Sequence, residues 1–165
     1  MQELQARAAN IELVIFDVDG VLTDGRLYLS ENGEEHKVFN AKDGHGIKML
    51  RATEMAVGII SARASPIVRQ RMQSLGVEHI FQGIEDKRSA YIELKDRLGL
   101  QDTQVAYVGD DVIDLPVMTQ VGLAIAVADA HALVKQQAHW TTSQKGGRGA
   151  AREVCELLLE AQGKL

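Results

Sequence analysis

Cysteine and aromatic residues are scarce in this sequence of 165 residues, and each shortage excludes a class of protein. The single cysteine, Cys155, cannot form an internal disulfide framework and is compatible with a reducing compartment. Aromatic residues make up only 4% of the chain, so stacking platforms for bases or sugars are few. We therefore expect neither a disulfide-stabilised scaffold nor recognition that depends on aromatic stacking.

An excess of basic charge and long apolar runs are also lacking. Lysine and arginine number 18 against 23 aspartates and glutamates, and the net charge of −5 argues against a general nucleic-acid binder. No apolar run approaches the roughly 18 residues that span a membrane. Residues 1–7 lack the basic and apolar pattern of a secretory signal. We expect a cytoplasmic protein without a nucleic-acid or membrane partner.

The remaining composition is that of an ordinary globular protein. Hydrophobic residues make up 45% and charged residues 25% of the chain. A chain of this length can bury a proper core without disulfides or metals to hold it together. Because no repeat, low-complexity tract or linker interrupts the sequence, residues 1–165 are expected to form one domain.

Short apolar runs alternate with amphipathic patterns along the chain. The runs are too short for helices and rich in β-branched residues or alanine, which is typical of strands buried on both faces. We predict such strands at residues 11–16, 56–60, 105–108 and 123–127, and an edge strand at Trp140-Thr141. Helices are predicted at residues 65–76, 86–99 and 149–162. This alternation predicts a three-layer α/β/α fold with a parallel sheet, whose catalytic residues follow the carboxyl ends of the strands.

Residues 25–39 interrupt this alternation and predict a β-hairpin that protrudes after the first strand. Asn32-Gly33 is the strongest short-range signal for a two-residue hairpin turn. Such a turn places Leu29 opposite His36 and gives the hairpin one apolar face. A lone hairpin is only marginally stable in water, so we expect this face to pack on the parent domain or on another subunit.

Two acidic clusters each follow a predicted strand. Asp17 and Asp19 come directly after the first strand, and the sequence Gly-Asp-Asp-Val-Ile-Asp at residues 109–114 follows the third. Acidic residues also cap loops and helices, but two clusters at matching strand ends favour a shared site. Grouped carboxylates make an all-oxygen pocket suited to a hard cation such as Mg²⁺.

A hydroxyl group and two cations accompany these carboxylates. Ser61 and Arg63 follow the second predicted strand. Lys87 lies at the start of a predicted helix, where the backbone amides also favour an anion. Together with a metal ion, these groups would allow an acidic pocket to accept a phosphate.

Taken in order, these residues resemble the four motifs of the haloacid dehalogenase superfamily of phosphohydrolases. The motifs are Asp17-x-Asp19-Gly20-x-x-Thr23, Ser61, Lys87 and Gly109-Asp110-Asp111-x-x-Asp114. The resemblance implies a Rossmann-like fold and favours a phosphatase, since a dehalogenase would not need an acid at position 19. The intervals between the motifs leave no room for a cap domain, so we expect another element, such as a neighbouring subunit, to cover the open pocket.

The resemblance also implies a role for each motif residue. Asp17 attacks phosphorus and becomes an aspartyl-phosphate, and Asp19 protonates the leaving oxygen and then activates water. Ser61 and Lys87 bind the phosphoryl oxygens. Mg²⁺ is the expected cofactor. Its expected ligands are the carboxylates of Asp17 and Asp110 and the backbone carbonyl of Asp19, with Asp111 and Asp114 orienting its bound waters.

Within the superfamily, the chain resembles the capless 3-deoxy-D-manno-octulosonate 8-phosphate (Kdo 8-phosphate) phosphatases. This resemblance extends over nearly the whole chain and is carried by residues 39–47, 109–118, 127–131 and 146–150. It implies hydrolysis of the sugar phosphate to Kdo and inorganic phosphate for lipopolysaccharide synthesis. It also implies a homotetramer formed through the hairpins, with the C-terminal segment, residues 145–165, reaching a neighbour's active site.

A sugar-acid phosphate carries a phosphate and a carboxylate, so a protein of net charge −5 needs a local group of cations. The residues that the resemblance implies as substrate contacts are Asp19, Asn40, Ala41, Lys42, Asp43, Gly44, Lys48, Arg63, Arg71 and Lys87. Arg71 is equally well explained as part of a polar helix face. The glycine-rich stretch around Lys145 and Arg148 predicts either a flexible tail or a lid over an active site.

Two positions depart from the family pattern. Ser61-Ala62 stands where the family usually has Thr-Gly, and the serine keeps the hydroxyl group. Lys42 stands where arginine is common, so it keeps the charge but loses the bidentate geometry.

Two other functions fit similar residues. A phosphatase for a nine-carbon sialic-acid-like 9-phosphate would use identical catalytic motifs, so only its substrates would differ. A phospho-accepting receiver domain also combines carboxylates, a hydroxyl group and a lysine. A receiver places an adjacent acidic pair at its first strand and the acceptor at a later one. Here Asp17-x-Asp19 comes first and the pair Asp110-Asp111 comes later, which favours a phosphatase that turns over.

Overall fold

Six strands form the central sheet of the computed structural model, which describes residues 1–165. The strands are β1 Leu13–Phe16, β4 Ala56–Ile60, β5 His79–Phe81, β6 Val105–Gly109, β7 Leu123–Ala126 and β8 Trp140–Thr141. They lie in the order β5-β4-β1-β6-β7-β8, and every neighbouring pair is parallel. The four predicted inner strands are confirmed as β1, β4, β6 and β7, and the predicted edge strand is confirmed as β8.

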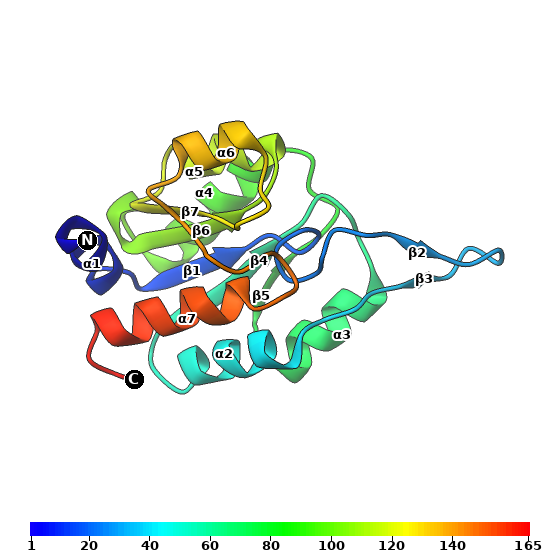
Figure 1. Ribbon diagram of the computed structural model, residues 1–165, viewed down its shortest axis with the longest axis horizontal. Coiled ribbons are helices and arrows are strands. Elements are labelled where there is room, and N and C mark those ends of the chain that lie inside the picture. Colours follow the sequence, from blue (N-terminus) through cyan, green and yellow to red (C-terminus); the bar gives the residue numbers. More distant parts are fainter.

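Helices cover both faces of this sheet (Figure 1). The helices are α1 Gln2–Ala9, α2 Ala41–Arg51, α3 Pro66–Ser74, α4 Lys87–Leu98, α5 Leu115–Met118, α6 Ala132–Gln137 and α7 Ala150–Ala161. Helices α4, α5 and α6 lie on one face and α2, α3 and α7 on the other, while α1 packs against α7. The predicted three-layer fold without a cap domain is therefore confirmed. None of these helices has both the length and the apolar character needed to cross a membrane.

The apolar core lies between the central strands and the helices that cover them. Every residue of β1, β6 and β7 is buried, as expected for strands that have helices on both faces. Helix α7 adds Val154, Leu157 and Leu158 to this core. Burial of each such side chain contributes roughly 1.5–3 kcal/mol. Cys155 is also fully buried there and serves as a small core residue.

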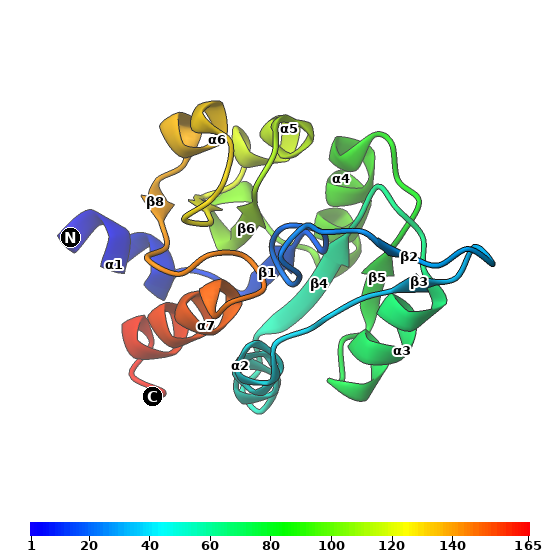
Figure 2. The same cartoon turned by 45° about the vertical axis from the view of Figure 1, so that its right-hand side comes forward.

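The strand order reverses at β1 (Figure 2). From β1 the chain runs outward through β4 to β5, and it then returns to β6 on the other side of β1. Phe16 at the end of β1 pairs with Ile59 of β4 and with Val108 of β6. The loops that follow these three strands therefore leave the same edge of the sheet, at the position where open α/β sheets bind their ligands.

The hairpin predicted at residues 25–39 is present, but the predicted register was wrong by one residue. Its strands are β2 Tyr28–Leu29 and β3 Glu35–His36, and Tyr28 rather than Leu29 lies opposite His36. The loop has three residues instead of two. The backbone N–H of Gly33 donates to the carbonyl of Ser30 at 3.0 Å, and Gly33 has a φ of +83°. A turn followed by a left-handed glycine is a common three-residue hairpin loop.

The hairpin extends away from the sheet (Figure 1). Leu27, Leu29 and Val38 are 48%, 66% and 58% exposed, so the parent domain does not cover these apolar side chains. His36, which the predicted register placed on the apolar face, is exposed as well. The parent domain therefore does not pack on this face, and packing on another subunit stays a prediction.

Two elements lack a clear signal in the sequence. Strand β5 has only three residues and is partly exposed at the edge of the sheet, so no apolar run marks it. Helix α1 has only one fully buried residue, Ala8, and its sequence is polar on most sides. Both elements depend on their neighbours: β5 pairs with β4, and α1 packs on α7.

Candidate active site

A cavity of about 280 Å³ opens at the edge of the sheet where the strand order reverses. The loops after β1, β4 and β6 line it, together with the first residue of α4. Residues predicted from the motifs make up most of the lining: Asp17, Asp19, Ser61, Arg63, Lys87, Asp110 and Asp111. The structure therefore brings all four predicted catalytic residues into one cavity with the predicted metal ligand Asp110.

Lys87 is buried and contacts two carboxylates. Its Nζ lies 3.1 Å from Oδ1 of Asp17 and 2.8 Å from Oδ1 of Asp114. The lysine is the first residue of α4. Asp86 caps the N-terminus of this helix by accepting a hydrogen bond from the backbone N–H of Ser89. Burial alone would lower the pKa of Lys87, but the two carboxylates raise it above its ordinary value. The ammonium group is therefore a fixed positive charge at the cavity.

Asp114 is fully buried and holds the loop after β6. Its Oδ1 accepts hydrogen bonds from Lys87 and from the hydroxyl of Tyr107, at 2.8 and 2.6 Å. Its Oδ2 accepts from the backbone N–H groups of Asp110 and Asp111, at 2.9 and 3.2 Å. Both oxygens thus have protein donors, and the expected role of Asp114 in orienting metal-bound water stays a prediction.

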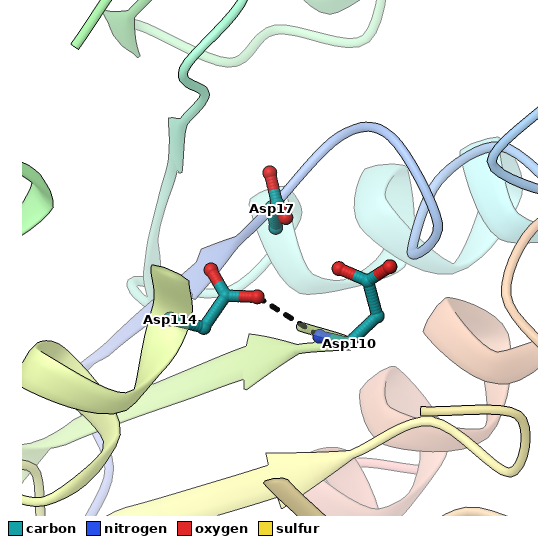
Figure 3. A group of neighbouring side chains, drawn as sticks. All are labelled: Asp17, Asp110 and Asp114. Carbon is teal, nitrogen blue, oxygen red and sulfur yellow. Dashed lines mark hydrogen bonds between the residues drawn. The ribbon is translucent and has the colours of Figure 1, made fainter. Parts of the chain in front are cut away.

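Three carboxylates converge beside the cavity (Figure 3). Asp17, Asp110 and Asp114 each offer one oxygen, and these oxygens lie within 4.8 Å of one another. Burial and the neighbouring carboxylates raise the pKa of Asp17 and of Asp110, although Lys87 partly opposes this for Asp17. A divalent cation would relieve this repulsion, and grouped carboxylate oxygens are the ligands that Mg²⁺ prefers.

The loop after β1 leaves space beside these carboxylates. Gly20 has a φ of +89°, and a Cβ atom added to it would overlap Oδ2 of Asp110. Only glycine permits this close approach in this conformation. Oγ1 of Thr23 accepts hydrogen bonds from the backbone N–H groups of Gly20 and Gly25, at 3.3 and 3.2 Å, and so keeps the loop closed. The residues present therefore fit a hard divalent cation held by oxygen ligands.

The glycine-rich segment before α7 packs on this same loop. The N–H of Gly147 donates to the carbonyl of Val21 at 2.9 Å, and the N–H of Gly146 donates to Oδ1 of Asp129 at 3.0 Å. A Cβ atom on Gly146 would overlap the carbonyl oxygen of Gly20, so the two backbones are in direct contact. This segment supports the loop after β1 and leads directly into α7, and its expected role as a lid over an active site stays a prediction.

Two cations from different elements contact Asp19. The Nζ of Lys37 lies 2.6 Å from Oδ1 of Asp19, and the Nε of Arg63 lies 3.8 Å from Oδ2. Both cations also reach Oε1 of Glu35 at 3.0 Å. Sequence reasoning identified Arg63 but missed Lys37 and Glu35. Their only signal was the alternation of charged residues around His36, which is common on exposed strands.

Most of the predicted substrate contacts lie outside the cavity. Of that set only Asp19, Arg63 and Lys87 line it. The others lie on α2 and α3 or just before α2: Asn40, Ala41, Lys42, Asp43, Gly44, Lys48 and Arg71. Arg71 lies against the first turn of α2, where a Cβ atom on Gly44 would overlap its guanidinium group. The contact of these residues with a substrate stays a prediction.

Two residues of that set cap helices. Oδ1 of Asn40 accepts hydrogen bonds from the backbone N–H groups of Lys42 and Asp43, at 2.8 and 3.2 Å. Oδ1 of Asp43 accepts from the backbone N–H of Arg152 in the first turn of α7, at 2.9 Å. Oδ2 of Asp43 is buried without a partner, and burial raises the pKa of this carboxyl group. Asn40 therefore caps α2, and Asp43 ties the start of α2 to the start of α7.

The chain is similar to proteins of known class. Residues 79–154 match the family model of haloacid dehalogenase-like hydrolases. The chain is 54% identical to the Kdo 8-phosphate phosphatase of Yersinia pestis over 159 residues. These residues make up 96% of this chain and 85% of that protein. The crystal structure of the Y. pestis phosphatase superposes with a TM-score of 0.98 at 53% identity, over 99% of this chain and 88% of the other.

A second similar structure contains ligands. It is the Kdo 8-phosphate phosphatase of Moraxella catarrhalis, crystallised with magnesium, phosphate and KDO. It superposes with a TM-score of 0.97 at 38% identity, over 99% of this chain and 94% of the other.

The fold, the acidic cavity and these similarities together define a phosphohydrolase of the haloacid dehalogenase class. The similarity to the Y. pestis enzyme is high and covers nearly the whole chain. The chain belongs to the family of the 3-deoxy-D-manno-octulosonate 8-phosphate phosphatases. The resemblance inferred from the motifs is thereby confirmed.

Proposed function

We propose that this protein hydrolyses Kdo 8-phosphate to Kdo and inorganic phosphate with Mg²⁺ as cofactor, and so supplies Kdo for lipopolysaccharide synthesis. The observation that carries the proposal is the meeting of Asp17, Asp19, Ser61, Lys87 and Asp110 at one cavity. The M. catarrhalis relative was crystallised with the same ion and with both products of this reaction, which supports the assignment.

Asp17 is the nucleophile in this proposal. Its Oδ1 accepts a hydrogen bond from the backbone N–H of Val18 at 2.7 Å and lies 3.1 Å from Lys87. Because these contacts hold Oδ1, we assign the attack on phosphorus to Oδ2, which forms an aspartyl-phosphate as the bond to the sugar oxygen breaks. The Lys87 ammonium and the buried Ser61 hydroxyl donate to the phosphoryl oxygens and stabilise their charge.

Asp19 is the general acid and base. In the first step its carboxyl group gives a proton to the leaving sugar oxygen. In the second step its carboxylate takes a proton from the water that attacks the aspartyl-phosphate. Inorganic phosphate leaves, and the carboxylate of Asp17 is regenerated.

We assign the metal ligands to the carboxylates of Asp17 and Asp110 and to the backbone carbonyl of Asp19. The grouped carboxylate oxygens and the space that Gly20 leaves beside Asp110 support this assignment. Asp111 and Asp114 are assigned to water molecules around the ion. When bound, Mg²⁺ neutralises charge on the transferring phosphoryl group.

The sugar acid requires contacts beyond the phosphate site. We assign Arg63 at the rim of the cavity to this role, together with a second set outside it: Asn40, Ala41, Lys42, Asp43, Gly44, Lys48 and Arg71. A homotetramer formed through the hairpins would cover the open cavity and bring residues of another copy to it. The exposed apolar side chains of Leu27, Leu29 and Val38 support such an assembly. A monomeric mass in sedimentation with full activity would refute it.

We also assign the protein to the cytoplasm. Its only cysteine, Cys155, is a buried free thiol, which is compatible with a reducing compartment. Fractionation of cells that make the protein would test this, and recovery of the protein outside the cytoplasmic fraction would contradict it.

A substrate panel tests the proposed reaction. Phosphate release is measured with Kdo 8-phosphate, a nine-carbon sialic-acid-like 9-phosphate and simple sugar phosphates, each with Mg²⁺ and with EDTA. We expect kcat/KM to be highest for Kdo 8-phosphate and turnover to require Mg²⁺. Faster hydrolysis of the nine-carbon substrate would change the assigned sugar. A stable phosphoprotein without turnover would indicate a receiver-like function.

A further inference from the structure

The hairpin carries a buried lysine that contacts Asp19 from outside the cavity. Lys37 follows β3, and its Nζ donates a hydrogen bond to Oδ1 of Asp19 at 2.6 Å. Its side chain is only 3% exposed, although the apolar side chains of the same hairpin are open to solvent. Asp19 lines the cavity, whereas Lys37 does not. Asp19 is therefore the cavity residue that Lys37 contacts directly.

Glu35 keeps Lys37 in place. The Oε1 atom of Glu35 accepts hydrogen bonds from Nζ of Lys37 and from Nη2 of Arg63, each at 3.0 Å. The spacing of two residues along the extended chain puts Glu35 and Lys37 on the same face of the hairpin. One charged network thus joins the base of the hairpin, the loop after β1 and the loop after β4.

We infer that Lys37 and Glu35 are positioning residues for Asp19, an inference that rests on the proposed function. The charge-assisted hydrogen bond from Lys37 fixes Oδ1 of Asp19 and restricts rotation of its side chain. Oδ2, which Arg63 approaches only to 3.8 Å, then remains available to exchange a proton with the leaving oxygen and with water. Misplacement of a reacting group by 1 Å costs on the order of 10²-fold in rate, so this restraint contributes to turnover.

The test compares substitutions at both positions, using the fastest substrate of the panel with Mg²⁺. We expect Lys37→Met to lower kcat by about 10- to 100-fold while KM stays within about twofold. Lys37→Arg should recover part of the loss, because a guanidinium group also donates to both carboxylates. Glu35→Gln keeps the size of the side chain and removes its charge, and should lower kcat by roughly 3- to 10-fold.

A second readout separates action through Asp19 from action on the substrate. In an Asp19→Asn background, Lys37→Met should change the single-turnover rate of Asp17 phosphorylation by less than about twofold. Lys135→Met is the matched control, because Lys135 is an exposed lysine of α6 that does not line the cavity. It should leave kcat and KM unchanged.

Three results would overturn the inference. One is a kcat of Lys37→Met and of Glu35→Gln that stays within about twofold of the wild-type value. Another is a rise in KM that accounts for the whole loss, which would make Lys37 a substrate contact. The third is an equal loss in the presence and absence of the Asp19 carboxylate. Failure of the wild-type protein to hydrolyse any member of the panel would instead refute the proposed function.

Discussion

The ammonium group of Lys87 lies 2.8 Å from Oδ1 of Asp114, and both side chains are completely buried. The same lysine lies 3.1 Å from Asp17, so one cation links the loop after β1 to the loop after β6. Asp114 in turn holds two backbone N–H groups of its own loop through Oδ2. The two acidic motifs are thus fixed to each other through a buried ion pair.

This arrangement predicts a large loss of stability when one partner is removed. Asp114→Ala leaves Lys87 with a single carboxylate and leaves two backbone N–H groups and the Tyr107 hydroxyl without an acceptor. Breaking a buried ion pair in this way costs about 3–5 kcal/mol of unfolding free energy. Urea denaturation monitored by circular dichroism measures it.

The matched control for that experiment is Glu93→Ala. Glu93 and Arg97 form an exposed pair one turn apart on α4, with both side chains more than half exposed. Exposed pairs contribute little, so this variant should unfold at nearly the wild-type urea concentration. Equal losses for Asp114→Ala and Glu93→Ala would contradict the anchoring role of Asp114.

Asp17→Asn should abolish phosphate release and keep the fold. The amide has the size of the carboxylate but cannot attack phosphorus, so we expect a loss of more than about 10³-fold in kcat. Burial raises the pKa of Asp17, so a neutral side chain is tolerated at this position. Phosphate release and thermal unfolding check the two halves of the prediction. Retained turnover with wild-type stability would remove Asp17 as the nucleophile.

Sequence patterns predicted the site residues that directly follow a buried strand of the sheet. Asp17, Ser61 and Asp110 each follow an apolar run, and the strand register carries all three to one edge of the sheet. This inference needed only the rule that parallel strands expose their carboxyl ends together. The buried strands were predicted for the same reason, because their burial on both faces requires a continuous apolar run.

Sequence patterns did not predict the features that depend on contacts between residues far apart in the chain. The sequence around Lys37 and Glu35 is typical of exposed charges on a hairpin, and only the folded structure shows that they lie beside Asp19. The family resemblance implies Asp43 as a substrate contact, and it gave no sign that Oδ1 of Asp43 accepts a hydrogen bond from α7, 109 residues away in the chain. The loop length of the hairpin was also missed, because Asn-Gly suits a two-residue turn and Gly33 equally well ends a three-residue loop.

Gly20→Ala should weaken metal binding. A Cβ atom at this position would overlap Oδ2 of Asp110, and the φ of +89° strains any residue other than glycine. The side chain of Asp110 then has to move, and we expect the Mg²⁺ concentration for half-maximal activity to rise about 10- to 100-fold. A titration of phosphate release against Mg²⁺ measures the change.

Gly99→Ala provides the control for this substitution. Gly99 also has a positive φ, +67°, but a Cβ atom there would meet nothing, and the residue ends α4 far from the carboxylates. It should lower the unfolding free energy by about 1 kcal/mol and leave the Mg²⁺ requirement unchanged. If both variants shift the Mg²⁺ requirement equally, backbone strain rather than the contact with Asp110 explains the effect.

Removal of divalent metal should make the stability of the protein depend on pH in a defined direction. Burial and neighbouring carboxylates raise the pKa of Asp17 from 3.8 to about 7 and that of Asp110 to about 9. A raised pKa in the folded state stabilises the fold at low pH, where both states are protonated, and this stability is lost as pH rises through the folded pKa. In EDTA, the unfolding free energy should therefore fall from about pH 4 to about pH 9.

Added Mg²⁺ should oppose this fall, because it binds the ionised carboxylates. At about 100 times its Kd the ion stabilises the folded state by roughly 2.7 kcal/mol, and its effect should increase with pH over the same range. Thermal unfolding at a series of pH values, with EDTA and with Mg²⁺, measures both trends. Asp110→Asn removes one of the buried charges, so it should flatten the pH dependence in EDTA and reduce the shift caused by Mg²⁺. A pH dependence in EDTA that Asp110→Asn left unchanged would contradict the repulsion between these carboxylates in the fold.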